Sequence, residues 1–230
     1  MQYPVLLFDL DQTLLDTDRN AQEALRQLDL PFDFAFDHDQ LAYWHRLNWE
    51  MWGQLEQKQL TQTELVNTRF SRYFDHFGIA VDGVACEQQF QGLFFAEHHL
   101  IAGAREILAA LHPHHQLVVI SNGSRAKQHQ QLAAAHIEHY FDRLFLAEEL
   151  GYSKPDPHFF KTVEATLAPA SPSDMLVIGD SLSADIAGAH QADLASVWFN
   201  PAHQDLPATS QPTYQIHQLT DLLPLLAAQD

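Results

Sequence analysis

Short apolar runs that alternate with helical patterns are the feature that most constrains how this chain can fold. Each run has the length and composition of a buried strand, and the runs lie at residues 5–8, 117–120, 144–146, 175–178 and 195–199. Helical periodicity occupies the intervals between them, at residues 103–111, 126–135, 157–167 and 184–191. Because strands that alternate with helices favour a parallel sheet covered on both faces, the sequence predicts an α/β fold.

Residues 16–98 interrupt this alternation, since they contain no run typical of a strand. Amphipathic helical patterns occur instead, at residues 18–30, 40–56, 62–77 and 83–95. The third pattern begins with Thr61 and Glu64 in the spacing of a capping box. We therefore expect a core made of residues 1–15 and 99–230, and an all-helical cap, residues 16–98, over the strand edge. A Pro-rich loop at 201–212 precedes a last short strand at 214–216 and a helix at 219–226.

The charge of the chain restricts its partners. The formal net charge is −18 over 230 residues, from 30 acidic and 12 basic side chains. Such a chain repels polyanions, which disfavours binding to nucleic acid or to an anionic membrane. A small phosphorylated ligand is still compatible with this charge. Charges beyond about 10 Å are screened, so one cation and a few local donors can offset the field.

Other compositional features exclude several classes of site. Cys86 is the only cysteine, so neither an intrachain disulfide nor a cysteine-based zinc site is expected. The 15 histidines, including those at 112–115, show no helical metal spacing beside other ligands, and we interpret them as solvated or structural. The N-terminal segment has acids inside its apolar run, and no stretch approaches the roughly 18 apolar residues of a membrane span. A cytoplasmic location is the simplest expectation, and no feature specifies an oligomeric state.

Two carboxylates follow the first predicted strand. Asp9 and Asp11 are two residues apart at a strand end, so their side chains can point to the same side. One of them can attack phosphorus while the other handles a proton. In isolation the pattern is weak, because Asp residues and Thr13 also serve as turn and helix-cap residues.

Candidate phosphate-binding groups follow the next strands. Ser121 and Asn122 end the second strand, where a hydroxyl and backbone N–H groups can hold phosphoryl oxygens. Lys154 is one of only four lysines, and the prolines at 155 and 157 that follow it restrict the chain. A rigidly held ammonium can neutralise a carboxylate and a phosphate together. An ordinary helix cap and a surface lysine are the structural alternatives.

Two further carboxylates follow the strand at 175–178. Asp180 follows the strand after one glycine, and Asp185 lies about one helical turn further on. Hard oxygen ligands suit Mg²⁺, which typically takes one or two carboxylates plus water and substrate oxygens. The structural alternative is a helix-capping Asp followed by an Asp of the first turn. Taken together, the motifs at 9–13, 121–122, 154 and 180–185 gather at one edge of the predicted sheet.

The four motifs also occur in the order and spacing of a known family. They are FDLDQTL at 8–14, SNG at 121–123, SKPDP at 153–157 and GDSLSADI at 179–186. In these residues the chain resembles the haloacid dehalogenase superfamily over most of its core. The resemblance implies a Rossmann-like parallel-sheet core with helices on both faces. The helical segment resembles the family's cap at the first of its two usual insertion sites.

The resemblance also implies roles for the motif residues. Asp9 is expected to be the nucleophile that forms an aspartyl-phosphate. Asp11 is expected to protonate the leaving oxygen and then to activate water, and Thr13 to support the loop. The residues expected to bind and steady the transferring phosphoryl group are Ser121, Asn122 and Lys154.

Magnesium is the cofactor that the resemblance implies. Its expected ligands are Asp9, the backbone carbonyl of Asp11, and Asp180, with Asp185 nearby. The physical chemistry agrees with this expectation. A carboxylate is a weak nucleophile, so a metal and Lys154 must offset its repulsion from an anionic phosphate.

Subfamily differences favour phosphate chemistry. The true dehalogenases of the superfamily carry no acid at the position of Asp11, because halide needs no leaving-group proton. Phosphonatases use a cap lysine as a Schiff base, and the only cap lysine here, Lys58, has no other support. The small cap and the plain motif around Lys154 do not resemble a transporting ATPase. The sequence therefore predicts a phosphoric monoester hydrolase.

Less specific features resemble the noncanonical pyrimidine nucleotidases of the superfamily. They are Asn48, Trp49 and Trp52 in the cap, residues 148–151, residues 198–200 with His203, and residues 212–214. This resemblance implies a 5′-nucleotidase acting on pyrimidine nucleoside monophosphates, with Asn48, Trp49 and Trp52 as candidate substrate contacts. Trp49 and Trp52 are three residues apart, so both can lie on one helix face and stack on a base.

Several alternatives remain open at this level. Trp44, Trp49 and Trp52 can instead form the packing core of the cap helices. The enzyme can be a broader sugar-phosphate or phosphoglycolate phosphatase, or resemble a phosphoglucomutase. A non-catalytic ligand-binding relative is the alternative of a different class, and the intact acids and Lys154 argue against it.

Overall fold

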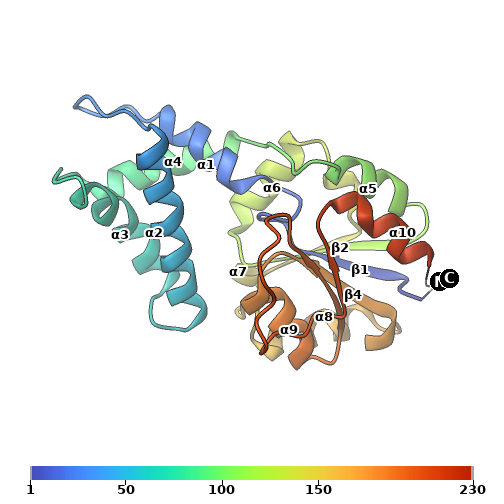
Figure 1. The fold of residues 1–230 in the computed structure, drawn as a ribbon. Helices are drawn as coiled ribbons and strands as arrows, with labels where there is room; N and C mark the ends of the chain where they lie inside the picture. Colours follow the sequence, from blue (N-terminus) through green and yellow to red (C-terminus); the bar gives the residue numbers. More distant parts are fainter. Residues whose placement is uncertain (1, 229–230) are drawn as a thin grey trace. The chain divides into compact units, whose positions relative to one another are not determined.

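The computed structural model describes residues 2–228, which contain a six-stranded, wholly parallel sheet (Figure 1). The strands lie in the order β3-β2-β1-β4-β5-β6. They are β1 (Val5–Phe8), β2 (Gln116–Ser121), β3 (Arg143–Leu146), β4 (Met175–Gly179), β5 (Ala195–Phe199) and β6 (Tyr214–Ile216). The predicted fold class is confirmed. The order reverses at β1, from which the chain adds β2 and β3 on one side and β4, β5 and β6 on the other.

Helices cover both faces of this sheet. Successive strand side chains point to opposite faces, so Leu6 and Phe8 pack in one apolar cluster and Val5 and Leu7 in another. The helices that contribute to the first cluster are α5 (Ala104–Leu111), α6 (Arg125–Ala134) and α10 (Leu222–Ala227). Those that contribute to the second are α7 (Ala147–Leu150), α8 (Pro157–Leu167) and α9 (Ala187–Gln191) (Figure 1). The fully buried run of β1 follows from this double cover.

Short irregular helices complete the sheet-containing part. They are the 3₁₀ segments η1 (Glu138–Tyr140), η2 (Pro172–Asp174) and η4 (Leu219–Asp221), and the π-helical turn η3 (Leu182–Ile186). The helix predicted at 184–191 thus begins as a π turn. The carbonyl of Ser181 accepts hydrogen bonds from the backbone N–H groups of both Asp185 and Ile186, which widens the turn.

Four longer helices form the segment between β1 and α5. They are α1 (Thr17–Arg26), α2 (His38–Glu56), α3 (Gln62–Asp75) and α4 (Gly83–Ala96). The capping box predicted at Thr61 and Glu64 is present at the start of α3. The helix predicted at 18–30 ends at Arg26, because Gln27 and Leu28 close the last turn with 3₁₀-type bonds and Pro31 disfavours helix before it.

The chain forms two compact units. One comprises Met1–Asp16 with His98–Asp230 and contains the sheet, and the other is Thr17–Glu97 and is entirely helical in its regular structure. The helical unit has its own core of aromatic side chains, including Trp44, Phe70, Tyr73, Phe74 and Phe90. None of the helices in residues 2–228 has the length and apolar character required to cross a membrane.

Candidate active site

The candidate residues of the core gather at one edge of the sheet. Asp9 directly follows β1, Ser121 is the last residue of β2, and Asp180 directly follows β4. These three strands are neighbours and run parallel, so their carboxyl ends meet at the same edge. The reversal of strand order at β1 makes this edge the place where open α/β sheets bind ligands.

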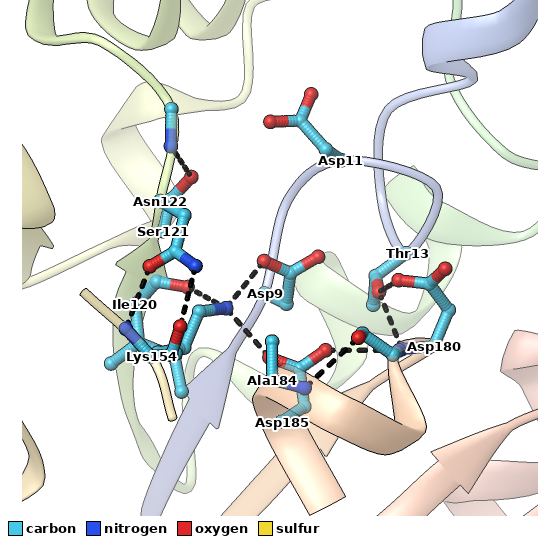
Figure 2. Close-up of polar contacts among 12 residues, drawn as sticks. Asp9, Asp11, Thr13, Ile120, Ser121, Asn122, Lys154, Asp180, Ala184 and Asp185 are labelled. Carbon is cyan, nitrogen blue, oxygen red and sulfur yellow. Dashed lines mark hydrogen bonds and ion pairs between the residues drawn. The ribbon is translucent and has the colours of Figure 1, made fainter. Parts of the chain in front are cut away.

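A buried ammonium joins two carboxylates at this edge (Figure 2). The Nζ atom of Lys154 lies 2.7 Å from Oδ1 of Asp9 and 2.6 Å from Oδ1 of Asp185, and it also donates to the carbonyl of Ile120 at 2.9 Å. Lys154 is only 2% exposed. A charge this deep in the protein requires such a complete set of partners, because an unpaired buried ion is strongly destabilising.

Asn122 fixes the segment that carries Lys154. Its side-chain amide donates to the carbonyl of Lys154 at 2.9 Å and accepts from the N–H of Lys154 at 2.8 Å. This reciprocal pair joins the end of β2 to the loop before α8. The predicted phosphate-binding role of Asn122 stays a prediction, and the role that its side chain has in the structure is to orient Lys154.

Thr13 and Asp180 form a second reciprocal pair. The hydroxyl of Thr13 donates to Oδ1 of Asp180 at 3.2 Å and accepts from the backbone N–H of Asp180 at 3.1 Å. The indole N–H of Trp198 donates to the Asp180 carbonyl at 2.9 Å. The loop after β1 and the loop after β4 are thereby held together, with the Asp180 carboxylate beside Asp9 (Figure 2).

The π turn η3 directs Asp185 back to the sheet. Its Oδ2 atom accepts from the N–H of Ser181 at 3.1 Å, while Oδ1 accepts from Lys154. Gly179 leaves room for this side chain, since a Cβ atom at residue 179 would lie 2.2 Å from Oδ2 of Asp185. Both carboxylate oxygens of Asp185 therefore already have protein donors, and the residue acts to orient Lys154.

The electrostatics of the cluster are dominated by burial and by like charges. Burial raises the pKa of Asp9 to about 7, with Lys154 opposing the shift and Asp185 and Asp11 adding to it. Loss of solvation, together with Asp9 and Asp185, raises the pKa of Asp180 well above its ordinary value. Burial alone would lower the pKa of Lys154, but Asp185 and Asp9 outweigh it and raise that pKa.

Three carboxylates at this edge form a cluster that fits a divalent cation. Oxygen atoms of Asp9, Asp180 and Asp185 all lie within 4.8 Å of one another. Hard carboxylate oxygens are the donors that Mg²⁺ prefers, and the single ammonium of Lys154 leaves an excess of negative charge among them. The donor set therefore fits magnesium, with Asp9 and Asp180 offering the oxygens that Lys154 does not already hold.

Asp11 lies apart from this cluster (Figure 2). Its carboxylate accepts from two side chains of α6, Lys127 and Gln128. The sequence interpretation did not select either residue, although Lys127 is one of only four lysines and lies four residues after the motif at 121–123. Gln128 also donates to Oγ of Ser121 at 2.9 Å, so it connects the predicted proton-transfer residue with a predicted phosphate ligand.

The candidate substrate contacts of the helical unit differ from one another. Trp44 is buried, whereas Trp49 is 73% exposed, so core packing is confirmed for Trp44 and is wrong for Trp49. Trp52 is partly buried against the same aromatic cluster as Trp44. The side-chain oxygen of Asn48 accepts from Arg69 at 3.0 Å and is therefore part of a buried polar network.

Comparisons with known proteins agree with this geometry. A family model described as haloacid dehalogenase-like hydrolase matches residues 3–193. The pyrimidine 5′-nucleotidase PynA of Streptococcus pneumoniae is 38% identical over 227 residues, covering 98% of this chain and 96% of its own length. The pyrimidine 5′-nucleotidase YjjG of Escherichia coli is 26% identical and covers 98% of this chain and 99% of its own length.

A solved structure is similar over the same extent. The putative HAD-hydrolase YfnB from Bacillus subtilis, crystallised bound to magnesium, superposes with a TM-score of 0.93 at 32% identity. The match covers 98% of this chain and 99% of the YfnB chain. The resemblance identified from the four sequence motifs is therefore confirmed at the level of both sequence and fold.

Proposed function

The chain belongs to the haloacid dehalogenase-like hydrolases, and from this membership we propose that it is a magnesium-dependent phosphomonoesterase that uses Asp9 as its nucleophile. The observation that carries the proposal is the position of the Asp9 carboxylate. It lies at the switch of strand order, held by the buried ammonium of Lys154 and beside the carboxylate of Asp180. A nucleophile in this setting is oriented by Lys154, and the charge of a phosphate would be offset by this ammonium together with a cation held by Asp9 and Asp180.

The first chemical step transfers the phosphoryl group to Asp9. A carboxylate oxygen of Asp9 attacks phosphorus, and the bond between phosphorus and the ester oxygen breaks. The leaving oxygen takes the bonding electron pair and receives a proton from Asp11. Lys154 stays beside the Asp9 carboxylate and offsets the negative charge that accumulates there.

The second step releases inorganic phosphate. Asp11, now a carboxylate, accepts a proton from a water molecule as that water attacks the phosphorus of the aspartyl-phosphate. The bond between phosphorus and the Asp9 oxygen breaks, which restores the carboxylate. Ser121, at the end of β2, is proposed to contact the phosphoryl oxygens together with backbone N–H groups of the following turn.

Magnesium is proposed to bind at Asp9, at the backbone carbonyl of Asp11 and at Asp180. When bound, it supplies positive charge that lowers the repulsion between the Asp9 carboxylate and the phosphate. Hydrogen bonds from Thr13 and Trp198 fix the position of Asp180, and the carboxylate of Asp185 accepts a hydrogen bond that fixes Lys154. These supporting contacts keep the ligands in place as the charge of the site changes.

The proposed substrates are nucleoside 5′-monophosphates with a pyrimidine base. Support comes from PynA and YjjG, which are pyrimidine 5′-nucleotidases and match nearly the whole chain. We propose that the helical unit supplies the discrimination between bases, because the core motifs recognise only the phosphate. The exposed indole of Trp49 is the best candidate for stacking, and Asn48 and Trp52 lie on the same helix, α2.

A phosphate-release panel tests this proposal. UMP, dUMP, dTMP, AMP and sugar phosphates are compared with magnesium and with EDTA, and Asp9→Asn protein serves as the matched inactive control. We expect turnover only with magnesium, and higher kcat/KM for the pyrimidine nucleotides than for AMP. A sugar phosphate with the highest kcat/KM would support a broad phosphatase instead, and binding without turnover would indicate a non-catalytic relative. The expected cytoplasmic location stays a prediction that cell fractionation can test.

A further inference from the structure

The first turn of α6 presents two buried polar side chains that the proposed mechanism does not use. Lys127 is 7% exposed and Gln128 is fully buried. They belong to the helix that follows β2, and Gln128 contacts Ser121 at the end of that strand, so they lie at the same sheet edge as Asp9 and Ser121. Burial of a lysine or a glutamine destabilises the folded protein unless the side chain has hydrogen-bond partners. The contacts of these two side chains therefore indicate their role.

Both residues contact Asp11. The ammonium of Lys127 forms an ion pair with Oδ1 of Asp11, and Nε2 of Gln128 donates to Oδ2 of the same carboxylate at 2.8 Å. Nε2 of Gln128 also donates to Oγ of Ser121 at 2.9 Å. Two donors from one helical turn thus hold the two oxygens of one carboxylate, which restricts its rotation.

The local sequence is built to place these donors. Ser124 caps α6, with its hydroxyl accepting from the N–H of Lys127 at 3.4 Å and its carbonyl accepting from the N–H of Gln128 at 3.1 Å. Gly123 leaves the space that Gln128 occupies, since a Cβ atom at residue 123 would lie 2.0 Å from Nε2 of Gln128. Any other residue at 123 would displace the amide from Asp11.

The orientation of Gln128 supports the same interpretation. Its Oε1 atom is buried and has no hydrogen-bond partner among residues 2–228. A buried acceptor without a partner costs about 1–3 kcal/mol, so the amide is kept in this orientation by what its nitrogen contacts. Those contacts are Asp11 and Ser121.

We propose that Lys127, assisted by Gln128, is a positioning residue that holds the Asp11 carboxylate where Asp11 exchanges protons with the leaving oxygen and with water. This proposal rests on the proposed function, in which Asp11 is the acid and base. The ion pair is more than a surface contact, because the side chains of Lys127 and Asp11 are only 9% and 29% exposed. A misplacement of a catalytic group by about 1 Å can cost on the order of 10²-fold in rate, so such a restraint matters.

The test compares two leaving groups. Lys127→Met removes the ammonium with little change in length, and kcat/KM is measured for p-nitrophenyl phosphate and for the alkyl phosphate that the panel turns over fastest. We expect a loss of about 10- to 10²-fold for the alkyl phosphate, within what general acid catalysis contributes. We expect little loss for p-nitrophenyl phosphate, because nitrophenolate departs without a proton. Lys127→Arg should restore most of the lost kcat/KM. Lys161→Met, which removes an exposed lysine, is the control for the change in net charge and should leave kcat/KM unchanged.

A second background distinguishes action through Asp11 from direct phosphate binding. In Asp11→Asn protein, adding Lys127→Met should produce no further loss of kcat/KM. If Lys127→Met lowers kcat/KM equally for both substrates, and does so in both the wild-type and the Asp11→Asn background, then Lys127 binds phosphate directly. If Lys127→Met lowers kcat/KM for neither substrate, the residue is purely structural. Either result overturns the proposal. If Asp11→Asn itself leaves turnover of the alkyl phosphate unchanged, the acid–base part of the proposed function fails independently. Should Lys127→Met not fold, Lys127→Gln replaces it with the same expectations.

Discussion

At the scale of single residues, the site is defined by an imbalance of buried charge. Three carboxylates, those of Asp9, Asp180 and Asp185, lie together, and the ammonium of Lys154 pairs with only two of them, Asp9 and Asp185. The pKa values of Asp9 and Asp180 are both raised, because burial and the neighbouring carboxylates make ionisation of these groups unfavourable in the folded protein when no cation is bound. The stability of the metal-free protein should therefore depend on pH in a way that identifies them.

The sign of this dependence follows from the pKa of Asp9. Its ordinary value is 3.8, and burial raises it to about 7 in the folded protein. Between these values the folded state binds more protons than the unfolded chain, so stability falls as the pH rises from about 4 to 7. In EDTA, the Tm of the wild-type protein should decrease by several degrees between pH 5 and pH 8. Asp9→Asn should show a smaller decrease, and exposed Asp205→Asn should behave as wild type. A Tm that rises over this range would contradict the assignment.

Gly179 provides a second residue-scale prediction. A methyl group at this position would meet Oδ2 of Asp185 at 2.2 Å, and only a displacement of Asp185 would relieve the contact. Because Asp185 holds Lys154, Gly179→Ala should lower kcat by about 10²-fold, the effect expected when a catalytic group moves by about 1 Å. Gly92→Ala is the matched control, since its added Cβ atom has no neighbour within 4 Å. Full activity of Gly179→Ala would show that Asp185 does not restrain Lys154.

At the scale of elements, a buried ion pair joins α3 to α4. The guanidinium of Arg69 donates to both carboxylate oxygens of Glu87, at 2.6 to 3.0 Å, and also to Asn48 of α2. It lies 5.0 Å from the ring of Trp44 and 5.1 Å from that of Phe90. One side chain therefore connects three helices of the helical unit through hydrogen bonds and cation–π contacts.

Breaking this pair should destabilise the helical unit strongly. Glu87→Ala leaves the Arg69 guanidinium buried without its carboxylate, which typically costs about 3–5 kcal/mol. Urea unfolding followed by far-UV circular dichroism measures the loss. Glu23→Ala, which removes the exposed ion pair with Arg26, should cost less than about 1 kcal/mol. Replacing both partners with Arg69→Met and Glu87→Leu should recover much of the stability. A loss below about 1 kcal/mol for Glu87→Ala would contradict the structural role of the pair.

The same scale shows what the sequence could predict. The strands were predictable because their apolar runs are local, and each appears within a few residues of its expected position. The π turn at η3 was not predictable, because the tertiary contacts of Asp185 with Lys154 and Ser181 accompany its wide hydrogen bonding. Periodicity predicted α1 to continue to residue 30, whereas Pro31 and the 3₁₀ closure of its last turn end it earlier.

The candidate site, like the fold, was predictable from the sequence only in part. The motif residues after β1, β2 and β4 could be assigned to one edge, because parallel strands bring their carboxyl ends together. Lys127 could not be assigned, because its partner Asp11 is 116 residues away and neither residue signals the pairing locally. Trp44 and Trp49 lie on the same helix and have the same chemistry. Only the packing of the helices decides that one is buried and the other 73% exposed.

At the scale of the whole molecule, the chemistry is concentrated in one of the two units. The proposed nucleophile, acid–base residue, lysine and metal ligands all belong to the unit that contains the sheet. The helical unit contributes no carboxylate to the cluster of Asp9, Asp180 and Asp185. A cation that binds this cluster should consequently stabilise the sheet-containing unit without needing any group from the helical unit.

Magnesium should therefore raise the thermal stability of the protein, and the size of the effect can be estimated. A ligand at a hundred times its Kd that binds only the folded state adds about 2.7 kcal/mol. For a chain of this size, that free energy corresponds to an increase in Tm of roughly 5–10 °C. Calorimetry at pH 8 in magnesium and in EDTA, at equal ionic strength, measures the increase. Asp180→Asn should lose most of it because a ligand is removed, while Glu87→Ala, although less stable, should retain it in the transition of the sheet-containing unit. The same Tm in magnesium and in EDTA, or an equal increase in Asp180→Asn, would show that the cation does not bind among these carboxylates.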